Sequence, residues 1–151
     1  MIAFVWNLAL LALAVPALAI PAPTESVDLG KRTISDVMNI NCQGVYFQDT
    51  YVEASAQKAA NHLKAGTTVG NNRYPHVYRN RPENFQFQAG CNAPYYEFPL
   101  MSNGRVYNGG DPKADRVVIG SWVSGTANAK LCGGVTHRGA TGNGFKQCSL
   151  Y

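Results

Sequence analysis

Four polar side chains, His76, Glu97, Arg116 and His137, lie in short segments that have strand character. Two imidazoles and one carboxylate suit general acid–base catalysis, because they can give and accept protons near neutral pH. A guanidinium suits the binding of a phosphate group. The four residue types together predict acid–base chemistry on a phosphate ester.

Each of these side chains also has an ordinary structural interpretation. Glu97 and Arg116 could form a cross-strand salt bridge, and His137 could cap a strand end. The segment NRYPHVYRNR around His76 could be an exposed edge strand, which tolerates proline and charge. However, a carboxylate among the apolar residues of APYYEFPL costs free energy unless it has a role. Because the four residues come from separate strands and can share one face, we favour the catalytic interpretation.

The sequence offers no protein nucleophile and no metal site. It contains no GxSxG motif, no acidic cluster and no CxxC or CxxH pattern. The nucleophile must then come from the substrate, and RNA carries one in the 2′-hydroxyl beside the scissile phosphorus, which DNA lacks. We therefore expect a single-stranded RNA substrate, no cleavage of DNA, and no metal or cofactor.

The strands that must position these residues follow one another in the second half of the chain. The candidates are YPHVY, APYYEFPL, RVVIGSW, LCGGVTH and GFKQCSL, separated by Gly, Asn and Pro turns. Alternation puts Tyr74, His76 and Tyr78 on one face of the first segment, and it puts Glu97 on the face opposite Phe98. This order predicts an α+β fold, with an antiparallel sheet and a helix on one of its faces.

One amphipathic helix is predicted before these strands. Thr50 and Glu53 match a capping box, which would start the helix there, and Gly66 suits its C-terminal stop. A single apolar stripe runs between them, made of Val52, Ala56, Ala59, Ala60 and Leu63. We expect this stripe to pack against the sheet.

The N-terminal region predicts secretion. The apolar run MIAFVWNLALLALAVPALA, residues 1–19, ends on the small-x-small pattern ALA and is typical of a signal peptide. A membrane anchor is the alternative, but Asn7 and Pro16 interrupt the run, which is short for a spanning helix. We therefore expect an extracellular protein without a membrane anchor.

A short polar segment separates the signal from the domain. Residues 20–32 end on the dibasic pair Lys31-Arg32 and predict a propeptide. The mature protein would be a single domain, residues 33–151, which we expect to be a monomer. The whole chain has a formal net charge of +4, and residues 1–32 hold two bases and two acids, so the mature domain keeps that charge. A basic secreted domain favours polyanionic partners, of which RNA is one.

Four cysteines lie in the predicted mature domain, and a secreted context predicts that they form two disulfides. They are Cys42, Cys91, Cys132 and Cys148. Three pairings are possible, and a link from Cys42 to Cys148 would close nearly the whole domain into one loop.

Four segments carry a resemblance to a known family. In order, YPHVY, PYYEFP, VYNGGDPKADRVV and VTHRGATGNGFKQC resemble the signature segments of the fungal guanyl-specific extracellular ribonucleases, the ribonuclease T-one family. The resemblance runs from about Cys42 to Cys148, nearly the whole predicted domain. It implies an endoribonuclease that cleaves single-stranded RNA 3′ of guanosine by way of a 2′,3′-cyclic phosphate. It also implies the disulfides Cys42–Cys148 and Cys91–Cys132.

The resemblance implies roles for the residues singled out above. Glu97 would be the general base that takes the 2′-hydroxyl proton, with His76 beside it to hold its charge and share its role. His137 would be the general acid that protonates the leaving 5′-oxygen. Three further side chains would surround the phosphate: Tyr74, Arg116 and Phe145.

The resemblance also implies a guanine pocket. Its residues would be Tyr78, which stacks on the base, the backbone of Arg79 and Asn80, the carboxylate of Glu83, and the backbone of Asn143. The segment RNRPENF departs from the family pattern, because it is one residue longer and lacks a second tyrosine. Arg81 or Pro82 would cover the base in its place.

Three other functions compete with this interpretation. A catalytically impaired secreted effector that binds RNA or protein would not need Glu97 and His137 together. A ribotoxin would carry long lysine-rich loops, whereas the connections here are short. A polysaccharide hydrolase usually needs two carboxylates, and Glu97 has no acidic partner in the four strands.

Overall fold

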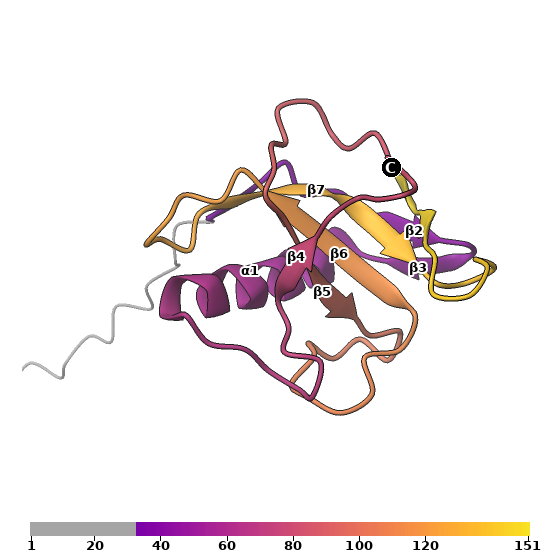
Figure 1. The fold of residues 1–151 in the computed structure, drawn as a ribbon, viewed down its shortest axis with the longest axis horizontal. Coiled ribbons are helices and arrows are strands. Elements are labelled where there is room, and N and C mark those ends of the chain that lie inside the picture. The colour runs from indigo at the N-terminus through magenta and orange to yellow at the C-terminus, as the bar shows by residue number, and fades with distance from the viewer. Residues whose placement is uncertain (1–32) are drawn as a thin grey trace, which may run out of the picture.

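The computed structural model describes residues 33–151. The predicted signal peptide and propeptide lie outside the described residues. One helix, α1 (Asp49–Ala65), packs against a twisted sheet, and a small second sheet lies beside it (Figure 1). The predicted α+β class is confirmed. None of the helices among the described residues is long and apolar enough to cross a membrane.

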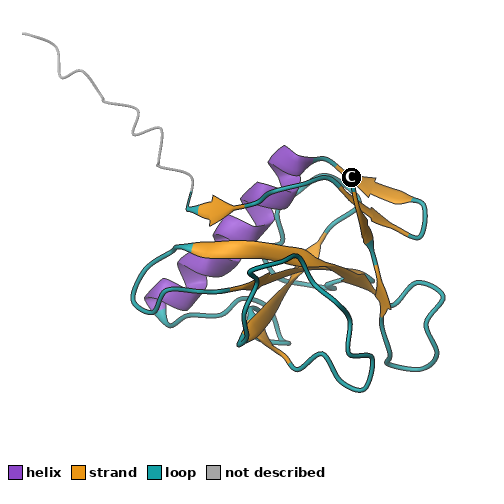
Figure 2. Cartoon of the chain, turned by 90° about the horizontal axis from the view of Figure 1, so that it is seen from above, coloured by secondary structure: helices purple, strands orange, loops and turns teal. Residues whose placement is uncertain are grey.

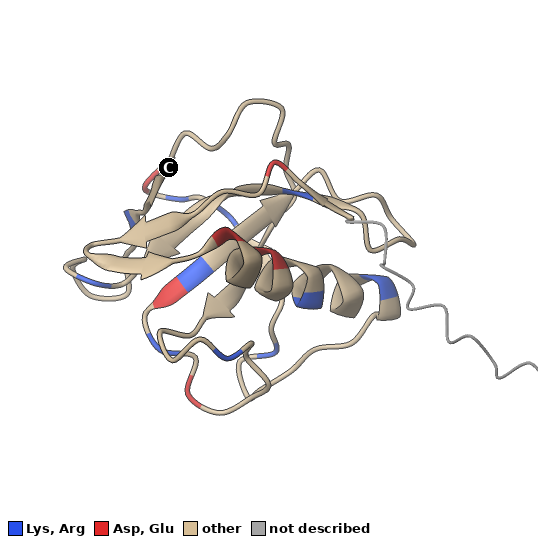
Figure 3. Cartoon of the chain, turned by 180° about the vertical axis from the view of Figure 1, so that it is seen from behind, with Lys and Arg blue, Asp and Glu red and all other residues tan. Residues whose placement is uncertain are grey.

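The main sheet has the strand order β1-β7-β6-β5-β4, and β8 also pairs with β7. Its strands are β1 (Ile34–Ser35), β4 (His76–Tyr78), β5 (Tyr95–Leu100), β6 (Asp115–Gly120), β7 (Ala129–Thr136) and β8 (Lys146–Gln147). All pairs are antiparallel except that of β1 with β7. The charged positions lie mostly on the helix and in the loops (Figure 3).

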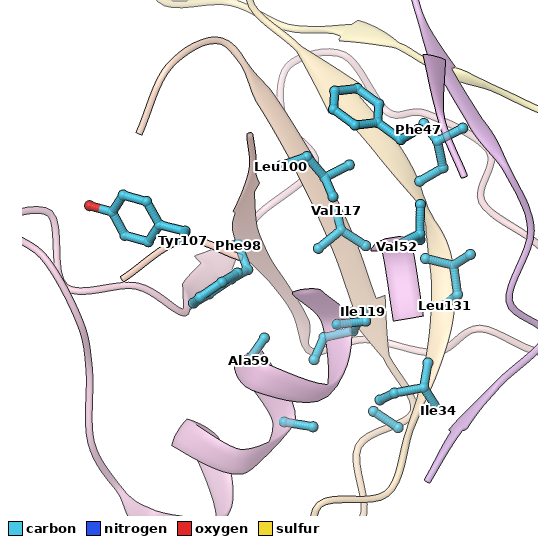
Figure 4. Close-up of a cluster of buried hydrophobic side chains, with 14 of the residues drawn as sticks. Ile34, Phe47, Val52, Ala59, Phe98, Leu100, Tyr107, Val117, Ile119 and Leu131 are labelled. Carbon is cyan, nitrogen blue, oxygen red and sulfur yellow. The ribbon is translucent and has the colours of Figure 1, made fainter. Parts of the chain in front are cut away.

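The apolar stripe of α1 packs on the main sheet, as predicted. Val52, Ala56, Ala59 and Ala60 are buried in one cluster with side chains of β5, β6 and β7 (Figure 4). Leu63 is partly buried against the same cluster. The helix lies along one side of the sheet, so the other side of β4–β7 is left for the site (Figure 2).

The two ends of α1 differ in how well the sequence predicted them. Gly66 ends the helix in the left-handed conformation, with φ of 64°. The capping-box prediction is wrong, because Thr50 lies inside the helix and the N-cap is Gln48, whose side chain makes no capping hydrogen bond. Asn39 Oδ1 instead accepts a hydrogen bond from the Asp49 backbone N–H at 2.8 Å.

A hairpin that the sequence did not predict precedes the helix. Strands β2 (Ile40–Cys42) and β3 (Val45–Phe47) pair across the tight turn Gln43-Gly44, both of whose residues have positive φ. β9 (Ser149–Leu150) pairs with β2, so the predicted strand GFKQCSL is split between the two sheets. The structure joins Cys42 to Cys148 and Cys91 to Cys132.

Candidate active site

The four predicted catalytic residues come together on the side of the sheet that faces away from α1. His76 on β4 is paired with Glu97 on β5, and Arg116 on β6 lies diagonal to Glu97, since Glu97 pairs with Val118. His137 directly follows β7, two residues after the partner of Arg116. The predicted alternation is therefore confirmed for His76, Glu97 and Arg116.

His76 and Glu97 form a close pair. His76 Nε2 lies 2.6 Å from Glu97 Oε1, and His76 Nδ1 lies 3.0 Å from the Asn72 carbonyl oxygen. Both neighbours accept hydrogen bonds, so an ionised Glu97 favours the imidazolium form with both ring nitrogens donating. The hydrogen bond with Glu97 raises the pKa of His76, which burial and the charge of Arg116 oppose. Glu97 is buried, with 7% of its surface exposed.

Arg116 faces the other oxygen of Glu97. Its Nε lies 3.8 Å from Glu97 Oε2, and among the described residues both atoms are buried without a hydrogen-bond partner. Nη1 of Arg116 is held by the carbonyl oxygens of Pro112, Lys113 and Asp115 at 2.8–3.1 Å. The two opposite charges form a loose ion pair with no hydrogen bond between them, an arrangement suited to a substrate that supplies both a donor and an acceptor.

Tyr74 contacts both His76 and Arg116. Its ring stacks on His76 with centroids 4.5 Å apart, and the Arg116 guanidinium carbon lies 5.2 Å from its centroid. Strand alternation predicted that Tyr74 shares one face with His76 and Tyr78. This is wrong for Tyr74, because it precedes β4 and packs in the core with Phe98.

The orientation of His137 is fixed by the turn after it. Its Nδ1 lies 2.7 Å from the Gly144 carbonyl oxygen, so Nδ1 carries a hydrogen and donates it. Its ring stacks on Phe145 with centroids 4.0 Å apart. These contacts leave Nε2 as the nitrogen that can exchange a proton with a substrate.

The sequence of this chain is similar to those of known ribonucleases. A ribonuclease family model matches residues 35–149. The chain is 44% identical over 107 residues to guanyl-specific ribonuclease Th1 of Trichoderma harzianum, covering 71% of this chain and 93% of the relative. It is 36% identical over 156 residues to guanyl-specific ribonuclease N1 of Neurospora crassa, covering 97% and 96%. The chain belongs to the ribonuclease family.

A solved structure of a ribonuclease from Hericium erinaceus, RNase He1, is 28% identical, with a TM-score of 0.44. The alignment covers 74% of this chain and 99% of that one.

The base-binding loop predicted for this ribonuclease follows β4 and is organised by Asn80. Asn80 has φ of 52°, and its amide group bonds the backbone N–H and carbonyl of Phe85 at 2.7 and 2.8 Å. Arg79, Arg81 and Pro82 are exposed around it. A cavity of 420 Å³ lies against this loop and is lined by both arginines.

The loop is tied to the turn that orients His137. Glu83 Oε1 accepts a hydrogen bond from the Phe145 backbone N–H at 3.0 Å. Asn143 lies exposed on the same turn. Tyr78 is only 6% exposed, and its ring meets Phe145 edge to face, so little of it is open to stack on a base in this conformation. Burial raises the pKa of Tyr78.

Three groups that shape the site were not singled out from the sequence. Two are the backbone carbonyls of Asn72 and Gly144, which residue types cannot reveal. The third is the buried carboxylate of Asp115, which bonds Thr136 and Arg138 on either side of His137. In the sequence, Asp115 directly precedes Arg116, and Thr136 and Arg138 flank His137. Only the strand register shows that Asp115 lies opposite Thr136.

Proposed function

We propose that this ribonuclease is secreted as a single domain, acts as a monomer, and cleaves single-stranded RNA on the 3′ side of guanosine without a metal ion. The observation that carries the proposal is the ion pair of Glu97 Oε2 and Arg116 Nε, two buried atoms that lie 3.8 Å apart and have no hydrogen-bond partner among residues 33–151. Beside them, His76 Nε2 lies 2.6 Å from the other oxygen of Glu97. A carboxylate oxygen with free lone pairs can take the 2′-hydroxyl proton, and the guanidinium can hold a phosphate oxygen.

In the first step, Glu97 accepts the 2′-hydroxyl proton and the 2′-oxygen attacks the phosphorus. Negative charge grows on the non-bridging oxygens, where Arg116, Tyr74 and the imidazolium of His76 stabilise it. His137 Nε2 gives its proton to the departing 5′-oxygen, and Phe145 holds the ring beside the phosphate. The products are a 2′,3′-cyclic phosphate and a free 5′-hydroxyl.

In the second step, water opens the cyclic phosphate with the proton transfers reversed. His137 takes a proton from water, and Glu97 returns its proton to the 2′-oxygen. The product is a guanosine 3′-phosphate end. DNA lacks the 2′-hydroxyl, so the same site would leave it intact.

We assign guanine recognition to the loop after β4. Glu83 would accept from the N–H groups of the base, the backbone of Arg79, Asn80 and Asn143 would bind its edge, and Tyr78 would stack on it. The guanyl-specific relatives support this assignment. In the present conformation Glu83 bonds Phe145, so base binding would exchange that contact for one with guanine.

The test is cleavage of GpU, ApU and CpU in a chelating buffer, with the products separated by mass. We expect guanosine 2′,3′-cyclic phosphate from GpU and little cleavage of the other two. Equal cleavage of all three would refute guanine recognition. Loss of cleavage in the chelator, with recovery on adding a divalent metal, would refute the metal-free mechanism.

A further inference from the structure

A buried carboxylate lies directly behind the proposed general acid. Asp115 is fully buried at the start of β6, on the face that α1 covers, and so it is not part of the catalytic set. The Thr136 hydroxyl donates to its Oδ1 at 2.6 Å. The Arg138 guanidinium donates to both of its oxygens, through Nε at 3.0 and 3.2 Å and through Nη2 at 2.9 Å.

These contacts hold the chain on both sides of His137. Thr136 and Arg138 are its two neighbours, and the Arg138 backbone N–H also donates to Thr136 Oγ1 at 3.0 Å. The backbone N–H of His137 donates to the Ala114 carbonyl oxygen at 2.9 Å. The three residues from Thr136 to Arg138 are therefore fixed to the beginning of β6, next to Arg116.

The geometry of the pair makes this attachment stiff. A guanidinium that meets both oxygens of a carboxylate is constrained in direction as well as in distance. Asp115 is buried, so water cannot readily replace Arg138 as its partner. Removing Arg138 would therefore leave an uncompensated buried charge. A side chain that contacts no substrate can thus set the position of one that does.

We propose that Arg138, through Asp115 and Thr136, is a positioning residue for proton donation by His137 to the leaving 5′-oxygen. This inference rests on the proposed role of His137 as general acid. Proton transfer requires the acid within hydrogen-bond distance of the atom that it protonates. Loosening the chain on either side of His137 should therefore impair the departure of poor leaving groups and spare good ones.

A comparison of two substrates tests this directly. GpU releases a nucleoside 5′-oxygen that must be protonated, whereas guanosine 3′-(4-nitrophenyl phosphate) releases 4-nitrophenolate, which departs as a stable anion. Both substrates form the same cyclic phosphate. For Arg138→Met we expect kcat on GpU to fall by ~10- to ~100-fold, as misplacement of a catalytic group by about 1 Å can cause. On the nitrophenyl ester we expect a much smaller loss.

Matched variants separate positioning from general stability. Lys130→Met removes a different ion pair, with Asp36 at 2.7 Å, from the opposite end of β7, and it should leave both rates unchanged. Arg138→Lys, which keeps the charge but not the two-point contact, should fall between wild type and Arg138→Met on GpU. If Arg138→Met does not fold, Asp115→Asn with Arg138→Met removes both charges, and the same substrate contrast is expected from it.

Equal losses on the two substrates, or no loss on either, would overturn the role of Arg138. The same selective loss in Lys130→Met would overturn it too. His137→Gln distinguishes this failure from failure of the proposed function. If His137→Gln impairs both substrates equally, the general-acid assignment itself is wrong. If it impairs GpU selectively while Arg138→Met does not, only the positioning inference falls.

Discussion

Glu97→Gln tests the assignment of the general base most sharply, because the structure predicts which group takes over. The amide keeps the shape of the buried side chain but has no basic oxygen. General acid–base groups typically contribute ~10²- to ~10⁴-fold, so kcat should fall within that range, equivalent to ~3–5 kcal/mol of activation free energy. We expect the lower end, because His76 Nε2 lies 2.6 Å from Glu97 Oε1 and can itself accept a proton when neutral.

The pH profile should change in a defined direction. The hydrogen bond with Glu97 is the main cause of the raised pKa of His76, so its loss lowers that pKa toward the ordinary value of about 6.5. With Glu97 as the proposed base, the wild type does not need neutral His76. In the variant, activity should rise with pH as His76 loses its proton, which moves the acid limb of kcat to higher pH. The basic limb, which reports the protonated acid, should stay in place.

The assay is kcat on GpU from pH 4 to 9, with guanosine 3′-phosphate affinity as a control for the base pocket. Product affinity at neutral pH should change little compared with kcat. Wild-type kcat in Glu97→Gln would refute Glu97 as the base. An unchanged acid limb would refute the exchange of roles with His76, and adding His76→Gln should then cause no further loss.

Four further changes to the protein should have measurable effects. Glu83→Gln should lower the GpU to ApU ratio of kcat/KM by ~10-fold or more, since a hydrogen bond to a charged group contributes ~1.5–3 kcal/mol. Phe98→Ala, in the core under the sheet, should lower the free energy of unfolding by ~3–5 kcal/mol in urea. Replacing Cys42 and Cys148 by alanine opens a loop with a sequence separation of 106 residues and should cost ~4–5 kcal/mol in the same assay. His76 has a raised pKa in the folded state, so its contribution to stability is present below about pH 6.5 and lost as pH rises through the folded value. Urea unfolding of wild type and His76→Gln at pH 5 and pH 8 measures that loss, and an equal difference at both pH values would contradict it.

The alternation of polar and apolar residues was enough to predict much of this molecule. In β5 it separated Glu97 from Phe98, and in β6 it separated Arg116 from Val117, because one face of each strand is buried under α1. The helix stop was predicted because Gly66 adopts a conformation that other residues disfavour. The helix start was not, because Asn39, ten residues before Asp49, replaces the expected local cap.

The limits of sequence reasoning are clearest at the two imidazoles of the candidate active site. Each has its Nδ1 bound to a backbone carbonyl in a neighbouring turn, His76 to Asn72 and His137 to Gly144. A carbonyl is present at every position, so no residue type marks the one that accepts, and only the path of the turn selects it. The same carbonyls decide which ring nitrogen faces the substrate, because an Nδ1 that donates to the backbone leaves Nε2 for chemistry. The sequence can therefore propose an acid and a base, whereas the turns on which they depend for orientation have to be seen in three dimensions.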